Sequence, residues 1–146
     1  MKKTFGLLIL CGLALVAAVA ADDPFVGTWK LNVAKSKFSP GPPLQSQTVT
    51  IGADKKVEVS GVDGKGQTIK WSYTAKPGTA TIIGMPDASV IETRKGNIVD
   101  HRWKIGKATQ MGHGVISKDG KSMIYTLQGT DADGKKVNDR SVYEKQ

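Results

Sequence analysis

The sequence predicts an all-β fold, a single antiparallel up-and-down β-barrel of about 8–10 strands. From residue 24 onward, short stretches of alternating apolar and polar residues recur every ~8–12 residues, a spacing typical of sandwiches and barrels. Asp63-Gly64, Asp119-Gly120 and Asp133-Gly134 separate some of them, and these pairs accept the positive φ of tight hairpins. Since tight hairpins join antiparallel neighbours, the strands follow one another in up-and-down order.

Ten segments fit this description, and we predict a strand for each. They are Gly27–Leu31, Gln47–Gly52, Lys56–Gly61, Gln67–Ala75, Thr79–Ile83, Ser89–Arg94, Ile98–Ile105, Thr109–Ser117, Ser122–Gly129 and Lys136–Lys145. Because successive side chains of a strand point to opposite faces, the alternation also assigns an inner face. The expected barrel interior, and the predicted ligand-binding set, is Trp71, Tyr73, His101, Trp103, Met123 and Tyr125. Glu92 and Asp100 are interpreted as outward charges.

One connection is too long for a hairpin, the segment from Asn32 to Ser46. It contains Pro40, Pro42 and Pro43, which exclude a long helix. We expect a single helical turn near its start, capped by Asn32. Phe38 is its isolated aromatic residue, and we expect it to pack onto the end of the barrel or to form part of a lid.

Residues 1–21 have the pattern of a cleaved signal peptide. Lys2 and Lys3 precede an apolar run, and cleavage is expected near Ala20 or Ala21. The apolar run is shorter than the ~20 residues of a comfortable transmembrane helix, so we expect a secreted or periplasmic protein without stable membrane insertion. Removal of 21 of the 146 residues leaves one domain of 125 residues, 22–146. Cys11 lies in the removed part, so the domain has no disulfide and depends on its own core.

The charge pattern does not indicate a nucleic-acid-binding protein. Lysine and arginine number 21 against 13 acidic residues, a net charge of +8, but the basic residues are scattered and no run exceeds two. Scattered lysines on alternating strands are typical of a solvated barrel exterior. A nucleic-acid site would instead need a clustered basic stripe with aromatic residues among it.

Residues for catalysis are scarce, and we predict no enzyme activity, no cofactor and no metal. His101 and His113 are the two histidines. His113 lies in Met111-Gly112-His113-Gly114, and a Met/His metal or haem site there lacks cysteines or spaced carboxylates to complete it. The two glycines indicate a bulge, or a position where a ligand or strand approaches closely.

The opening segment Phe25-Val26-Gly27-Thr28-Trp29-Lys30-Leu31 resembles the first strand of intracellular fatty-acid-binding proteins and, more loosely, of lipocalins. Val142-Tyr143-Glu144-Lys145 resembles the last strand of the former, and the whole chain resembles small secreted bacterial lipocalin-like proteins of the calycin group. The resemblance implies that Trp29 closes one end of the barrel, with Arg140 or Lys145 on its indole face. The residues expected to form this closure are Phe25, Gly27, Trp29, Arg140 and Tyr143. Ser141 stands where the fatty-acid family has a carboxylate-binding arginine, so the ligand does not carry over.

Two functions follow from this fold. The first is a monomeric protein that binds a small hydrophobic molecule inside the barrel. The alternative is a solid barrel of the cell envelope that binds a protein or an anionic polymer through its basic surface. The two differ in one observable property, since eight to ten strands enclose either packed side chains or one ligand cavity.

Overall fold

The computed structural model describes residues 22–146, and the predicted signal peptide lies outside the described residues. All ten predicted strands are present. They are β1 (Gly27–Leu31), β2 (Ser46–Ile51), β3 (Lys56–Val62), β4 (Thr68–Thr74), β5 (Thr79–Thr81), β6 (Ala88–Lys95), β7 (Ile98–Ile105), β8 (Ala108–Ile116), β9 (Ser122–Thr130) and β10 (Lys136–Lys145). The described chain contains one further element, the 3-10 turn η1 (Val33–Lys35), and no helix long and apolar enough to cross a membrane.

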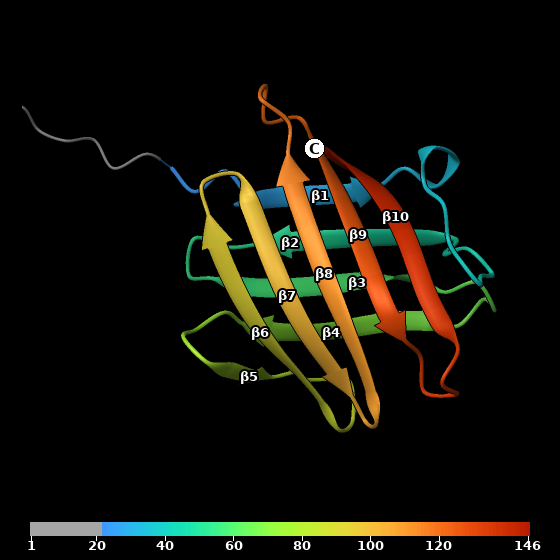
Figure 1. Cartoon of the computed structure of the whole chain (residues 1–146). Coiled ribbons are helices and arrows are strands. Elements are labelled where there is room, and N and C mark those ends of the chain that lie inside the picture. Colours follow the sequence, from blue (N-terminus) through green and yellow to red (C-terminus); the bar gives the residue numbers. More distant parts are fainter. Residues whose placement is uncertain (1–21) are drawn as a thin grey trace, which may run out of the picture.

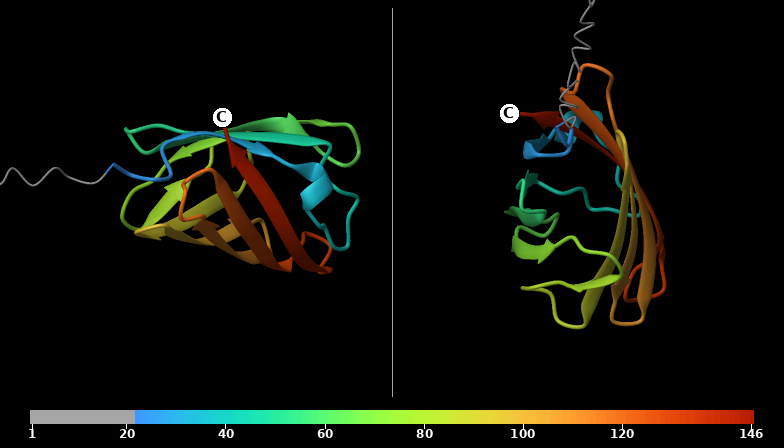
Figure 2. Two further views of the ribbon diagram at one scale, coloured as in Figure 1. Left: turned by 90° about the horizontal axis from the view of Figure 1, so that it is seen from above. Right: turned by 90° about the vertical axis from the view of Figure 1, so that its left-hand side faces the viewer.

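The strands form one antiparallel sheet in the order β4-β3-β2-β1-β10-β9-β8-β7-β6-β5. Apart from β1 with β10, each pair in this order is consecutive in the chain, which confirms the predicted up-and-down barrel. In Figure 1, β1–β5 run across the view behind the steeply inclined β6–β10. Figure 2 shows the two layers facing each other across the interior. Inward side chains of both layers therefore meet in one central space.

The barrel has one seam, between β4 and β5. These two strands are the ends of the sheet order, and they are linked only by an isolated bridge between Ser72 and Ile83. In that bridge the Ser72 N–H donates to the Ile83 carbonyl at 3.0 Å, and the reverse bond measures 2.8 Å. The barrel is therefore nearly closed, with a short edge strand, β5, beside the seam.

Trp29, in the middle of β1, is completely buried. Its indole N–H donates to the Phe25 carbonyl at 2.8 Å. The Lys145 ammonium lies 5.1 Å from the ring centroid, within cation–π range, and donates to the Pro24 carbonyl at 3.2 Å. Of the two candidate cations Arg140 and Lys145, Lys145 is therefore the one over the indole. Arg140 is exposed, and its backbone pairs with Lys37.

Gly27 is needed for this arrangement. Its φ of 137° lies outside the region that other residues adopt easily, and a Cβ there would approach the Lys145 side chain to 2.7 Å. The aliphatic part of Lys145 thus crosses β1 at the one position that lacks a side chain. The opening motif and the end of the chain therefore pack against each other.

The long connection between β1 and β2 begins with the expected turn. The Asn32 side chain accepts a hydrogen bond from the Lys35 N–H at 3.1 Å and caps η1. The chain then runs beside β10, where the Lys37 N–H donates to the Arg140 carbonyl at 2.8 Å. From this segment Phe38 and Leu44 pack against the core, which confirms that Phe38 folds back onto the barrel.

Candidate ligand-binding site

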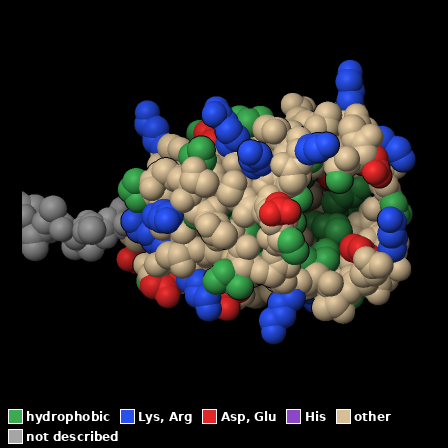
Figure 3. All heavy atoms as spheres, turned by 90° about the horizontal axis from the view of Figure 1, so that it is seen from below, with side chains coloured by type: hydrophobic (Ala, Val, Ile, Leu, Met, Phe, Trp, Pro, Cys, Tyr) green, Lys and Arg blue, Asp and Glu red, His purple; other side chains and the backbone are tan. Residues whose placement is uncertain are grey.

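The barrel contains a cavity of about 220 Å³. From below, Figure 3 shows a hollow lined by hydrophobic side chains, with charged side chains around its rim. Strands of both layers contribute to the lining. Its apolar members are Phe25, Phe38, Leu44, Val49, Ile51, Val57, Val59, Met85, Val99, Ile105 and Leu127, together with the aromatic residues below. A solid barrel, on which the alternative function depended, does not fit this structure.

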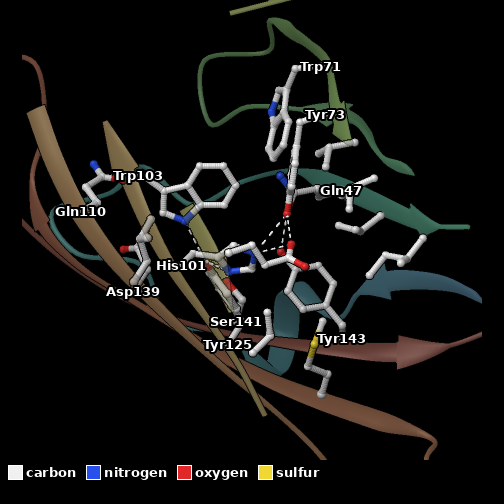
Figure 4. A pocket seen from close by; sticks show the side chains of 18 of the residues that line it. Gln47, Trp71, Tyr73, His101, Trp103, Gln110, Tyr125, Asp139, Ser141 and Tyr143 are labelled. Atoms are coloured by element: carbon white, nitrogen blue, oxygen red, sulfur yellow. Dashed lines mark hydrogen bonds and ion pairs between the residues drawn. The ribbon is translucent and has the colours of Figure 1, made fainter. Parts of the chain in front are cut away.

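All six residues predicted for the interior line the cavity. Five of them form one aromatic cluster on β4, β7 and β9, and Figure 4 shows its members converging from these strands. The Trp71 and Trp103 rings meet edge to face at 5.6 Å, and His101 stacks on Trp103 at 4.9 Å between centroids. The sixth residue, Met123, is buried and also lines the cavity. Such pairs fix the ring orientations and make one rigid wall of the cavity.

A chain of hydrogen bonds connects the polar atoms of this cluster. The Trp103 indole N–H donates to the Tyr125 hydroxyl at 2.8 Å, and this oxygen lies 3.1 Å from His101 Nδ1. On the other side of the ring, His101 Nε2 lies 3.0 Å from the Glu92 carboxylate. Tyr73 also donates to this carboxylate, at 2.5 Å. With the imidazole proton on Nε2 and the Tyr125 proton directed at Nδ1, every one of these atoms is satisfied.

Glu92 corrects the sequence analysis, which interpreted it as an outward charge. Its side chain is only 5% exposed. Strand β6 places Ala88, Val90, Glu92 and Arg94 on the inner face, whereas Ile91 is on the outside and 38% exposed. The alternation from Val90 could have indicated this orientation, but the isoleucine at 91 favoured the opposite face. Asp100 is outward as predicted, and it pairs with His113 at 2.7 Å in solvent.

Arg94 neutralises the buried carboxylate and ties it to the start of the domain. Its Nε donates to the Glu92 carboxylate at 2.5 Å, and its Nη1 donates to the Asp23 carboxylate at 2.8 Å. The guanidinium also lies 5.3 Å from the centroid of the Phe25 ring. Arg94 therefore has two carboxylate partners, Glu92 and Asp23, which hold its guanidinium in place.

The environment of Glu92 determines its charge. Burial alone raises the pKa of a carboxyl, but hydrogen bonds from His101 and Tyr73 and the charge of Arg94 outweigh burial and lower the pKa of Glu92 to about 2. Burial also raises the pKa of the Tyr73, Tyr125 and Tyr143 hydroxyls, so they stay protonated. Glu92 thus lines the cavity as an ionised carboxylate whose hydrogen-bond donors are already in place.

Gly112 and Gly114 make room for the network. They are inward positions of β8, and a Cβ at 112 would overlap the Tyr125 hydroxyl. At 114 a Cβ would approach the Val99 side chain to 2.7 Å. Of the two interpretations of this glycine pair, close approach is the one observed: the Tyr125 ring lies across β8, and the strand pairs continuously with its neighbours.

A second group of polar side chains lies on β10, and only Asp139 among them was not considered in the sequence analysis. Tyr143, like Phe25, was expected in the barrel closure, but both line the cavity. Asp139, Ser141 and Tyr143 are successive inward positions and all line the cavity. Tyr143 donates to the side-chain oxygen of Gln47 on β2, two strands away in the sheet. Asp139 accepts a hydrogen bond from the Ser39 N–H at 2.8 Å, and burial raises its pKa. Gln110 on β8 completes this side of the lining (Figure 4).

The arrangement offers a binding cavity with oriented polar groups and no evident metal centre. In residues 22–146, no group of three or more His, Cys, Asp or Glu side chains is placed to hold a metal ion. Every buried side-chain nitrogen or oxygen of that range has a hydrogen-bond partner. His101 is engaged through both ring nitrogens, so it serves to orient Tyr125 and Glu92.

Comparison with known proteins does not extend this description to a family. No protein-family model matches the sequence, and no curated protein sequence matches it significantly.

Proposed function

We propose that this protein binds a small, mostly apolar molecule in its barrel cavity and carries out no reaction on it. The cavity of about 220 Å³ with its largely apolar lining supports this most strongly. Ligand sites are typically concave, mostly apolar and supplied with a few placed polar groups, which is the composition found here. Sites for drug-sized ligands span ~300–1000 Å³, so the ligand is a smaller molecule.

The proposal also states where the protein acts and which group of proteins it resembles. We propose a secreted or periplasmic, lipocalin-like protein that acts as a monomer. The pattern of residues 1–21 supports this location, because a basic start and an apolar run are followed by small residues at the expected cleavage point. Supporting the relationship is the ten-stranded up-and-down barrel that begins with the Gly27–Trp29 motif.

A pair of valine variants tests the cavity directly. Val49 is an inward residue of β2 that lines the cavity, and Val115 is an outward residue of β8. The neutral fluorescent amine N-phenyl-1-naphthylamine serves as the probe, and its emission rises in an apolar site. We expect Val49→Phe to weaken its binding at least tenfold because the larger ring occupies the cavity, and Val115→Phe to leave binding unchanged. Equal binding by both variants and by the unmodified protein would place the probe outside the barrel.

A further inference from the structure

We infer that the ligand carries a protonated amine, which pairs with Asp139, and an aromatic or aliphatic body that fills the apolar part of the cavity. This inference rests on the proposed function and specifies its ligand class. It follows from the distribution of charge in the cavity wall. Two carboxylates, Glu92 and Asp139, and one guanidinium, Arg94, line the cavity.

The guanidinium is unsuited to hold an anionic ligand. Arg94 donates to Glu92 at 2.5 Å and to Asp23 at 2.8 Å, so two carboxylates already share its charge. An anionic ligand would bring a third negative charge to this cation, and one that displaced Glu92 would leave a buried carboxylate without its partner, which is strongly destabilised. The cavity therefore disfavours carboxylate or phosphate head groups.

Asp139 is the complementary case. It is half-buried, and within residues 22–146 no lysine, arginine or histidine nitrogen lies within ion-pairing distance of it. One carboxylate oxygen accepts the Ser39 N–H, and the other has no partner in the same residues. A partly desolvated carboxylate that lines a cavity without a cation beside it favours a ligand that supplies one.

The bond to Ser39 does not by itself account for a carboxylate at this position. The same loop is held by the Asn138 N–H, which donates to the Ser39 carbonyl at 2.9 Å, and by the Lys37–Arg140 backbone pair. An asparagine would serve the Ser39 N–H equally well, since it keeps one acceptor oxygen. Holding this loop therefore does not require the negative charge of Asp139.

The remaining walls suit the body of such a ligand. Inward positions of β7, β8, β9 and β10 align as His101, Gly112, Leu127 and Asp139 across the sheet. Asp139 therefore shares a row with the imidazole, and Trp103 is the next inward residue beyond it on β7. Asp139 can therefore pair with the ammonium while the aromatic side chains of β7, three strands away in the sheet, contact the body of the ligand.

Three indole derivatives of similar size separate charge from shape. Tryptamine is cationic, tryptophol is neutral and indole-3-propionate is anionic. Measured by isothermal titration calorimetry at pH 7, we expect tryptamine to bind at least tenfold more tightly than tryptophol, and indole-3-propionate to bind most weakly. In Asp139→Asn, which keeps the acceptor for Ser39, we expect the preference for tryptamine over tryptophol to disappear while tryptophol affinity stays unchanged.

The control is Asp100→Asn, which removes an exposed carboxylate from the outer face and should leave all three affinities unchanged. If tryptophol or indole-3-propionate binds as tightly as tryptamine, or if Asp139→Asn keeps the tryptamine preference, the inference is wrong but the cavity still binds ligands. If none of the three binds, the inference is also wrong, and the valine pair with the neutral probe then decides the proposed function separately.

Discussion

Glu92 shows how strongly a single side chain depends on partners that are distant in the sequence. Its hydrogen-bond donors Tyr73 and His101 lie 19 residues before it and 9 after it, on two other strands. The pKa of the carboxyl falls from 4.5 in the unfolded chain to about 2 in the fold. Since the folded protein holds the proton more weakly, ionised Glu92 stabilises the fold at neutral pH, by about 3 kcal/mol.

This contribution predicts a pH dependence of stability. It is complete above about pH 5, and it is lost as the pH falls from about 5 to about 2. Urea unfolding measured across that range should show the free energy of unfolding of Glu92→Gln changing less with pH than that of the unmodified protein. Glu58→Gln is the control, because Glu58 is exposed and pairs only with Lys56 at the surface. Identical pH profiles for Glu92→Gln and the unmodified protein would show that Glu92 is not held in this network.

At the scale of single elements, the strands were predictable, whereas the inward carboxylates Glu92 and Asp139 were missed. Strands Gly27–Leu31, Ile98–Ile105 and Lys136–Lys145 match their predicted bounds, because alternation and turn glycines are local signals. β5 ends at Thr81, two residues early, where the chain reaches the seam. The alternation of β6 allowed either face for Glu92, and the residues that face Glu92 and Asp139 lie on other strands, so the sequence of one strand does not identify them.

Strand β1 provides a test that separates closure from binding. Trp29 is fully buried but does not line the cavity, whereas Trp103 does. Trp29→Ala should therefore lower the free energy of unfolding by ~3–5 kcal/mol and leave the affinity of the folded fraction for N-phenyl-1-naphthylamine nearly unchanged. Trp103→Ala should weaken binding of the probe. Chemical denaturation and fluorescence titration measure the two effects, and a stable Trp29→Ala protein without binding would contradict this division of roles.

At the scale of the whole molecule, the question that the sequence left open was whether the barrel is filled. The ten strands and their inward residues were predictable, but the space between them depends on how the two layers are set apart. Here Trp71, Trp103, Tyr73 and Tyr125 pack against one another. Valines such as Val49, Val57 and Val59, on β2 and β3, line the cavity beside Trp71 and Tyr73. Side chains of this size leave a space of about 220 Å³ between them.

A protein with such a cavity should carry its ligand when it is purified gently from the organism that makes it. Native mass spectrometry of that material should show the protein with one added mass of a small molecule, which is released when the protein is denatured. A spectrum with only the unliganded chain, together with no rise in thermal stability across a panel of small amines, lipids and haem, would contradict the proposal that this barrel is a binding protein.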